Sequence, residues 1–290
     1  MIALRRIDHV RLRTADVDEA TARWAAQFGL VRREPGRLAC DDEPYCLELA
    51  PDEPHVAYEL RRSCSLDDAR AHLDACGTPY EEYDGGLHVA DPDGNRVVLL
   101  PYREPVSRLV PHARPARDQI VGHPRKLGHV NFLTGAMAEQ VAFYTRVLGM
   151  RVTDWLGDGG VWFHINPDHH VMALIDKGYT HFHHLAFDVV DIGQMRDHLD
   201  HLGRHGRWLG WGPTRHGVGG NIASYVRIVE EECFVELYCD MEQLDPDHEP
   251  RNWPDDRFSS NTWGSLPPRS YFRFDDAAVE SERDSLEMLA

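Results

Sequence analysis

The chain has 290 residues, of which 42% are hydrophobic and 27% are charged, so it can form one large domain or two ordinary ones and is not globally disordered. Its formal net charge of −17 would repel nucleic acids and anionic membrane surfaces, so we expect neither as a partner. The apolar runs are too short to span a membrane, and the chain enters strand-like sequence at once, so we expect no signal peptide.

The six cysteines are scattered along the chain and include no CxxC pair. This distribution is typical of free thiols in a reducing compartment rather than of a disulfide framework or a zinc–thiolate site. We therefore expect a cytoplasmic protein.

In chain order, the first predicted element is a strand at residues 7–13, followed by a helix that begins at Asp16 or Asp18 and ends near Phe28. Gly29 then supplies the left-handed residue that commonly ends a helix. These elements are consistent with one β-α unit followed by further strands.

A second unit of the same kind follows. A strand begins at His55, a helix is predicted at residues 66–76 with Gly77 after it, and the turn at 91–94 joins two closing strands. Pro- and Arg-containing sequence then leads to residue 126.

The same order returns in the second half of the chain. IDHV at 7–10 reappears as LGHV at 127–130, and QFGL at 27–30 reappears as VLGM at 147–150. HVAYEL at 55–60 corresponds to HLAFDV at 184–189, and a fourth pair begins at His88 and Tyr225. Four matches in one order indicate a duplicated domain.

In the second copy, helices are predicted at residues 136–148 and 192–202, followed by Gly149 and Gly203. The predicted fold class is α+β, with two tandem domains of two βαβββ units each. The predicted boundaries are residues 1–108, a linker at 109–126, a second domain at 127–245 and a tail at 246–290.

Three residues of the second copy form a candidate metal site. His129 and His184 lie in corresponding strands, and Glu236 lies in a closing strand among apolar residues. A carboxylate in such a strand is costly to bury unless it is paired or bound to a cation. Because strand side chains alternate faces, all three can point to one side of a curved sheet. Two imidazoles and one carboxylate form the facial triad of non-haem iron sites, although a single histidine is more often a surface or core residue.

The first copy serves as an internal comparison. Its equivalents are His9, His55 and Leu99, so no carboxylate is expected there. Two neutral ligands without an anion make a poor divalent-metal site. We therefore expect the first copy to be structural.

These features resemble the type I extradiol ring-cleavage (catechol 2,3-) dioxygenases of the vicinal oxygen chelate superfamily, nearest to the homoprotocatechuate and catechol group. The resemblance covers nearly the whole chain. It rests on His216, Tyr225 nine residues later, Glu236, the HHLAF run at 183–187 and the tail motif at 263–271. The turn before Glu236 departs from the family pattern, because three glutamates replace an Asp-Pro-x-Gly sequence.

The resemblance implies two vicinal-oxygen-chelate domains, each an incomplete barrel, of which only the C-terminal one is catalytic, with residues 246–290 as a lid. It also implies a homo-oligomer. Fe(II), or alternatively Mn(II), would be held by His129, His184 and Glu236, with a catecholic small molecule and O2 as substrates. The donor set alone does not choose between the two metals.

The resemblance also implies roles for other residues. His170 would be the acid–base group, and strand alternation favours it over His169. His216 and Tyr225 would hydrogen-bond substrate oxygens, and Trp162 would line the oxygen side of the pocket.

Substrate contacts are less constrained by the sequence. Trp211 stands where homoprotocatechuate enzymes carry an arginine for the substrate carboxylate. An indole cannot pair with a carboxylate, so an uncharged aromatic or alkyl substituent is favoured. Arg269 or Arg273 could still provide a cation from the tail.

The implied function is a dioxygenase of aromatic hydrocarbon catabolism that inserts both atoms of O2 next to the diol, giving a muconic-semialdehyde-type product. The alternatives are a hydroxyphenylpyruvate-type dioxygenase, a glyoxalase or epimerase, and a non-catalytic small-molecule-binding protein. Glyoxalases and epimerases generally use a fourth protein ligand. A binding module would need neither Glu236 nor His170.

Overall fold

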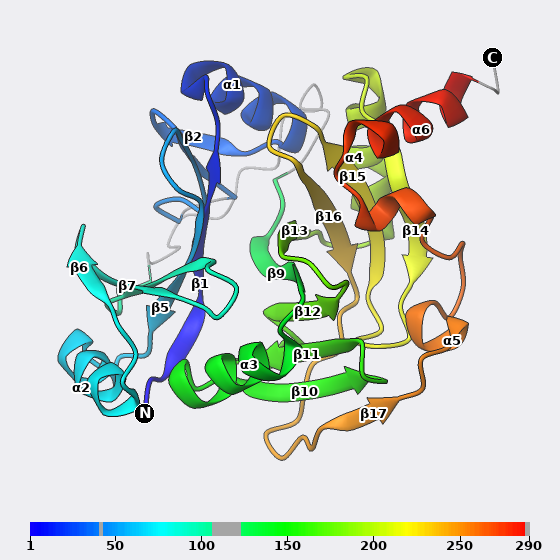
Figure 1. Ribbon diagram of the computed structural model, residues 1–290. Coiled ribbons are helices and arrows are strands. Elements are labelled where there is room, and N and C mark those ends of the chain that lie inside the picture. The colour runs from blue at the N-terminus through cyan, green and yellow to red at the C-terminus, as the bar shows by residue number, and fades with distance from the viewer. Residues whose placement is uncertain (41–42, 106–122, 288–290) are drawn as a thin grey trace.

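The computed structural model describes residues 1–40, 43–105 and 123–287. Within these ranges the chain forms an 8-stranded sheet from the N-terminal repeat and a 9-stranded sheet from the C-terminal repeat, which lie side by side in Figure 1. The predicted α+β fold of two tandem domains, each built from two βαβββ units, is confirmed. The predicted linker at 109–126 lies outside the described residues as far as residue 122, and the first strand of the second sheet begins at Lys126.

The N-terminal repeat contains ten elements. They are β1 (Leu4–Arg13), α1 (Val17–Phe28), β2 (Val31–Glu34), β3 (Arg37–Ala39), β4 (Leu47–Ala50), β5 (His55–Leu60), α2 (Leu66–Cys76), β6 (Glu81–Tyr83), β7 (Gly86–Ala90) and β8 (Arg96–Leu100).

The C-terminal repeat follows the same plan, except that its first helix continues into a π-helical turn, η1. Its elements are β9 (Lys126–Thr134), α3 (Met137–Ala142), η1 (Phe143–Val147), β10 (Arg151–Leu156), β11 (Gly160–His164), β12 (Met172–Asp176), β13 (His181–Asp188), α4 (Ile192–Arg204), β14 (Leu209–Arg215), β15 (Ile222–Ile228) and β16 (Cys233–Cys239).

The tail is ordered into further elements. They are β17 (Arg251–Trp253), α5 (Arg257–Ser260), a 3-10 turn η2 (Arg269–Phe272) and α6 (Asp276–Glu287). β17 extends the C-terminal sheet by pairing in parallel with β10. The tail is therefore attached to the sheet that carries the candidate site.

Both sheets share one pairing pattern. The closing strand of each unit pairs in parallel with the first strand of that unit, as β4 does with β1 and β16 with β13. The first strands of the two units pair antiparallel at the centre, β1 with β5 and β9 with β13. Residues near the middle of these central strands are therefore brought together from distant parts of the sequence.

Most of the predicted helix ends are found. Asp16 caps α1, and its side chain accepts a hydrogen bond from a backbone N–H of the first turn. Gly29 and Gly77 follow their helices with φ of 66° and 65°. The prediction for Gly203 is wrong, because α4 runs through it, and Gly206, with φ of 74°, lies in the left-handed region instead.

The acidic turn before Glu236 joins the two repeats. The Glu231 side chain is fully buried and accepts hydrogen bonds from the guanidinium of Arg23, at 2.5 Å, and from the indole N–H of Trp24, at 3.0 Å. α1 also packs against the second repeat through Phe28 and Phe187, whose ring centroids are 6.3 Å apart. The departure from the family turn sequence therefore supplies an inter-repeat ion pair.

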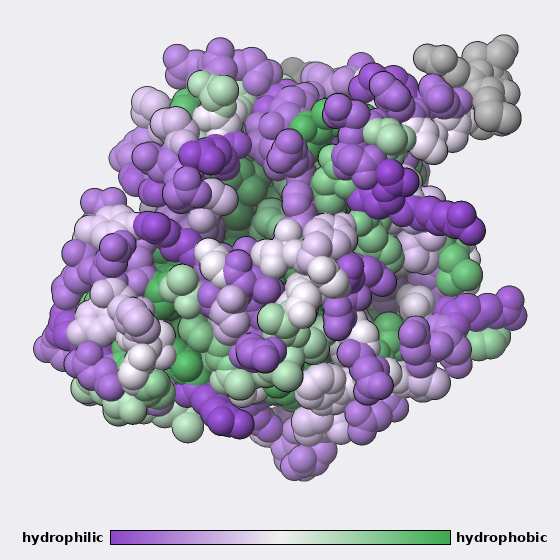
Figure 2. All heavy atoms as spheres, viewed as in Figure 1, coloured by the Kyte–Doolittle hydropathy of each residue, from purple (hydrophilic) through white to green (hydrophobic). Residues whose placement is uncertain are grey.

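Hydrophilic side chains cover most of the face seen in Figure 2, with hydrophobic ones visible between them in small groups. No helix in the described ranges is long and apolar enough to cross a membrane.

Candidate metal centre and active-site cavity

Strand register brings the three predicted metal ligands together. Ala186 on β13 pairs with His129 on β9 and with Glu236 on β16. His184 lies two residues before Ala186 and so points to the same face of the sheet. One ligand atom from each of the three residues lies within 4.8 Å of the others.

The cluster is buried and compact. His129, His184 and Glu236 are 2%, 5% and 1% exposed. One oxygen of Glu236, Oε2, lies 2.9 Å from His129 Nε2 and 3.1 Å from His184 Nε2. The amide of Asn221 donates to the other oxygen, Oε1, at 3.0 Å. Burial alone would raise the pKa of Glu236, but the two imidazoles hold it well below its usual range, so the carboxylate is ionised.

A second histidine sets the tautomer of His184. His183 Nε2–H donates to the carbonyl of Tyr271 at 2.9 Å, and burial holds the pKa of His183 well below its usual range. The neutral His183 therefore accepts at Nδ1 from His184 Nδ1–H, at 2.8 Å. The lone pair of His184 Nε2 then faces the Glu236 carboxylate. A ring nitrogen and a carboxylate oxygen that both direct lone pairs at each other require a cation between them. These ligand atoms therefore fit a divalent metal ion.

A similar pair lies beside the cluster. His170 is buried, and its ring centroid is 4.3 Å from that of His129. His169 Nε2–H donates to Asp154 at 3.0 Å, so in its neutral form His169 accepts at Nδ1 from His170 Nδ1–H, also at 3.0 Å. His170 therefore keeps a lone pair on Nε2. Burial lowers the pKa of His170 well below its usual range, so its resting form is neutral.

Asp154 is itself held in place behind His169. Arg251 and the indole N–H of Trp253 both donate to its carboxylate, at 2.8 and 2.7 Å. Burial opposes ionisation of Asp154, but hydrogen bonds from His169 and Arg251 outweigh it and lower the pKa of Asp154. The tail strand β17 thus takes part in orienting His170.

His216 and Tyr225 form a third pair at the site. The carbonyl of Ser260 accepts from His216 Nδ1–H at 2.9 Å, so His216 Nε2 accepts from the hydroxyl of Tyr225 at 2.8 Å. Burial, together with the charge of Glu236, raises the pKa of Tyr225 well above its usual value. Tyr225 is therefore a neutral phenol directly opposite Glu236 in the β15–β16 pairing.

The three predicted ligands face one cavity of about 440 Å³, and His170, His216 and Tyr225 face it too. In addition to the three predicted metal ligands, the cavity wall includes five other residues predicted from the sequence: His170, Trp162, Trp211, His216 and Tyr225. His169 is not among the lining residues, which agrees with the alternation argument.

The predicted cations of the tail do not reach this cavity. Arg269 and Arg273 are exposed and are not on its wall, and Arg273 pairs with Asp275 at 2.8 Å. Turn η2 instead directs Tyr271 and Phe272 into the cavity. This segment carries both arginines and aromatic residues, and two of the aromatic residues lie on the cavity wall.

Other lining residues were not singled out from the sequence. They are Asn131, Leu156, Gly159, Ala173, Ile175, Asp176, Lys177, His183, Val218, Asn221, Asp255, Ser259, Ser260 and Pro267. Asn221 is the most informative of them, since it contacts Glu236, and it lies between His216 and Tyr225 in the motif that was already recognised.

The N-terminal repeat contains a second cluster of potential metal ligands among the described residues. His9 and His55 occupy the predicted positions, and Glu48 on β4 lies beside them. The expectation that this repeat lacks a carboxylate is therefore wrong. Only the closing strand of its second unit, β8, lacks a carboxylate at this position. There Ala57 pairs with Val98, as Ala186 pairs with Glu236, so Val98 rather than Leu99 occupies the position of Glu236. Glu236 lies 11 residues after Tyr225, its partner on β15, whereas Val98 lies 10 residues after His88, its partner on β7, and this difference accounts for the shift.

Comparisons with known proteins agree with this architecture. The model of the glyoxalase/bleomycin resistance protein/dioxygenase superfamily matches residues 126–224. Over 95% of its length the chain is 28% identical to metapyrocatechase 2 of Cupriavidus necator, of which 93% is covered.

Solved structures with this fold include proteins of different activity. The homoprotocatechuate 2,3-dioxygenase of Arthrobacter globiformis superposes with a TM-score of 0.77 at 23% identity, over 93% of this chain and 91% of that one. The Mn(II)-bound glyoxalase of Novosphingobium aromaticivorans superposes with a TM-score of 0.76 at 24% identity, over 93% of this chain and 94% of that one. Residues 126–224 therefore match the glyoxalase/bleomycin resistance protein/dioxygenase superfamily, and along nearly its whole length the chain is similar to a metapyrocatechase.

Proposed function

We propose that this protein is an extradiol ring-cleavage dioxygenase, which inserts both atoms of O2 into a catecholic ring next to the diol and yields a muconic-semialdehyde-type product. The observation that carries the proposal is the arrangement of one cavity. Two imidazoles and a carboxylate meet at its wall, and His170 lies against them with its Nε2 unprotonated.

His129, His184 and Glu236 would hold the metal, leaving the remaining positions open. Bound Fe(II), or Mn(II), would supply adjacent coordination positions for the catechol oxygens and O2 and a path for electrons between them. Asn221 holds Oε1 of Glu236 and so leaves Oε2 directed at the two histidines. His183 and Asn221 thereby fix the ligand orientations before substrate arrives.

His170 is the proposed acid–base residue. A neutral imidazole with a free Nε2 can accept a proton from a catechol hydroxyl and return it to the substrate as the ring opens. Asp154 and His169 keep its other nitrogen protonated, so the lone pair is on the nitrogen left free for substrate. A positioned general acid–base group of this kind typically accelerates a reaction by about 10²–10⁴-fold.

His216 and Tyr225 are proposed to bind substrate oxygens. The Tyr225 hydroxyl donates to His216 and keeps acceptor lone pairs, so the pair can take a hydrogen bond from a substrate hydroxyl. The stacked indole of Trp211, whose ring lies 5.0 Å from Tyr225, limits movement of the phenol.

The cavity favours a catechol with an uncharged substituent. Trp211 donates its indole N–H to the carbonyl of Ser265 and presents an apolar face to the cavity. The one lysine or arginine on the wall among the described residues is Lys177, whose ammonium lies 4.2 Å from the ring of Phe272 and next to Asp176. Asp176 and Asp255 would repel a substrate carboxylate.

The glyoxalase alternative has less support from the site. The strand position that could offer a fourth ligand, occupied by Glu48 in the N-terminal repeat, is Ala173 in the C-terminal one. A site with three protein ligands keeps more coordination positions open, as a reaction with two bound substrates requires.

The test is metal reconstitution followed by oxygen uptake. Metal-free protein is loaded anaerobically with Fe(II) or Mn(II), given 4-methylcatechol and then exposed to air. We expect consumption of one O2 per catechol and a yellow product, with homoprotocatechuate turned over more slowly. Tight binding of the catechol to metal-loaded protein without oxygen uptake would contradict the proposal and favour a binding protein.

A further inference from the structure

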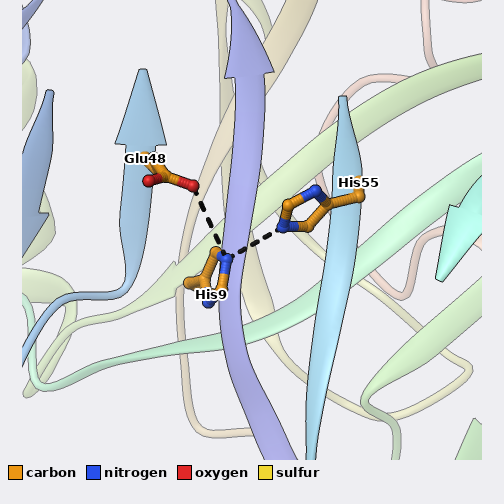
Figure 3. Close-up of side chains that lie close together, drawn as sticks. All are labelled: His9, Glu48 and His55. Carbon is orange, nitrogen blue, oxygen red and sulfur yellow. Dashed lines mark hydrogen bonds and ion pairs between the residues drawn. The ribbon is translucent and has the colours of Figure 1, made fainter. Parts of the chain in front are cut away.

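The N-terminal repeat holds a second set of donors in its central strands. β1 lies between β4 and β5, and Figure 3 shows Glu48 and His55 directed from these flanking strands toward His9. Arg11, two residues after His9, pairs with Glu48 on one side and His55 on the other, so the register brings the three side chains to one face.

The donor atoms are close enough to share one ion. His9 Nε2 lies 2.9 Å from His55 Nε2 and 3.9 Å from Glu48 Oε2, and the three donor atoms lie within 4.8 Å of one another. Atoms bound to one Zn²⁺ at about 2.0–2.1 Å are separated by about 3–3.5 Å. A small rotation of Glu48 would close the set.

The hydrogen bonds of His9 direct a lone pair into the cluster. Its Nδ1–H donates to Asp8 at 2.7 Å, which is the carboxylate–histidine arrangement found behind metal ligands. The Nε2 lone pair of His9 therefore points toward His55 and Glu48. The carboxylate of Asp8 is in turn held by Arg103.

His55 is suited to the same task. It is 6% exposed, and its Nδ1 has no hydrogen-bond partner. Its other ring nitrogen, Nε2, is the one directed at His9, and it is the atom that would bind the ion.

We propose that His9, His55 and Glu48 form a second metal site, which binds a divalent transition-metal ion of the imidazole-preferring class, represented by Zn²⁺. The set consists of two imidazoles and one carboxylate, which is a donor composition that such ions take. Its geometry is independent of the C-terminal cluster, so the proposal does not rest on the dioxygenase function.

The arginines around Glu48 set the strength of this site. Arg11 donates to Oε2 at 2.7 Å and Arg37 to Oε1 at 3.0 Å. A metal would have to displace Arg11 from Oε2, and the positive charge would remain nearby. The N-terminal site is therefore weaker than the C-terminal one, whose carboxylate has no arginine partner among the described residues.

The test counts metal ions in variants that separate the two sites. Metal-free protein is dialysed against Zn²⁺ and its metal content measured, with Co²⁺ absorption as a second readout. We expect two equivalents in the unmodified protein, one in Glu236→Gln, one in His55→Phe and none in Glu236→Gln/His55→Phe. His72→Phe, which removes a partly exposed histidine of the same repeat, should keep two.

A conservative variant covers the case in which His55→Phe does not fold. Glu48→Gln preserves side-chain volume and, in the Glu236→Gln background, should weaken Zn²⁺ binding at least tenfold and remove the rise in Tm that Zn²⁺ causes. A single equivalent in the unmodified protein would overturn the proposal. So would retention of Zn²⁺ by the double variant, or by Glu236→Gln/Glu48→Gln at unchanged affinity.

Discussion

The two repeats carry histidines at the same two strand positions, but the carboxylate that completes each ligand cluster comes from a different strand. In the C-terminal repeat the carboxylate comes from the closing strand of the second unit, and in the N-terminal repeat it comes from the closing strand of the first. The neighbours differ too. By strand register, Asn131 corresponds to Arg11, and Ala173 corresponds to Glu48. His170, three residues before Ala173, therefore corresponds to Tyr45, three residues before Glu48.

This comparison teaches that the ligand pair alone does not define the chemistry. The C-terminal cluster opens onto the 440 Å³ cavity and has an acid–base group beside it. In the N-terminal cluster, Glu48 pairs with Arg11 and Arg37, and the Tyr45 ring lies 4.7 Å from that of His9. A cluster with an acid–base group beside it fits turnover, whereas a cluster whose carboxylate is held by two arginines fits metal binding alone.

The largest expected effect is that of Glu236→Gln, which removes the anion of the open site. Turnover should fall by at least about 10³-fold and the C-terminal metal should be lost, because the two imidazoles alone bind divalent ions poorly. Oxygen uptake and metal content check this. Glu232→Gln, an exposed change before the same strand, is the control, and full activity of Glu236→Gln would refute the assignment.

His170→Phe should separate the acid–base group from the metal cluster. We expect turnover to fall by about 10²–10⁴-fold while one equivalent of metal stays in the C-terminal site. Steady-state kinetics and metal analysis measure the two effects. The matched change in the other repeat, Tyr45→Phe, should leave turnover unaltered. An undiminished rate in His170→Phe would remove this residue from the mechanism.

Asp154→Asn tests the support behind His170. An amide can donate to His169, which would reverse the tautomer and place a proton on His170 Nε2. We expect kcat to fall by about 10–100-fold with little change in KM, as for other residues that orient a functional group. A KM increase at constant kcat, or a loss of metal, would assign Asp154 a structural role instead.

The smallest effect concerns the charge around the N-terminal cluster. Arg11→Gln removes the cation that competes for Glu48 and makes the position resemble Asn131. Zn²⁺ affinity in the Glu236→Gln background should rise by about tenfold, or roughly 1.4 kcal/mol, as expected for a partly screened neighbouring charge. Arg13→Gln, an exposed change on the same strand, controls for net charge. Unchanged or weaker binding in Arg11→Gln would contradict the competition.

The sequence by itself determined the duplication, the order of elements and the residues of the C-terminal cluster. Repeated motifs and local signals are short-range information, and two-residue alternation is enough to place His129, His184 and Glu236 on one face. The helix ends at Gly29 and Gly77 follow from the same local rules. The homo-oligomer and the catalytic roles stay predictions.

Only the tertiary structure decided which other side chains meet the histidines. Glu48 reaches His9 because β4 pairs with β1 in one register, and a one-residue change in a turn moves Val98 into the place expected for Leu99. The tail likewise brings Tyr271 rather than Arg269 to the cavity. These outcomes depend on pairings between segments far apart in the chain, where a shift of one residue reverses the face of every side chain, and local sequence patterns do not contain that information.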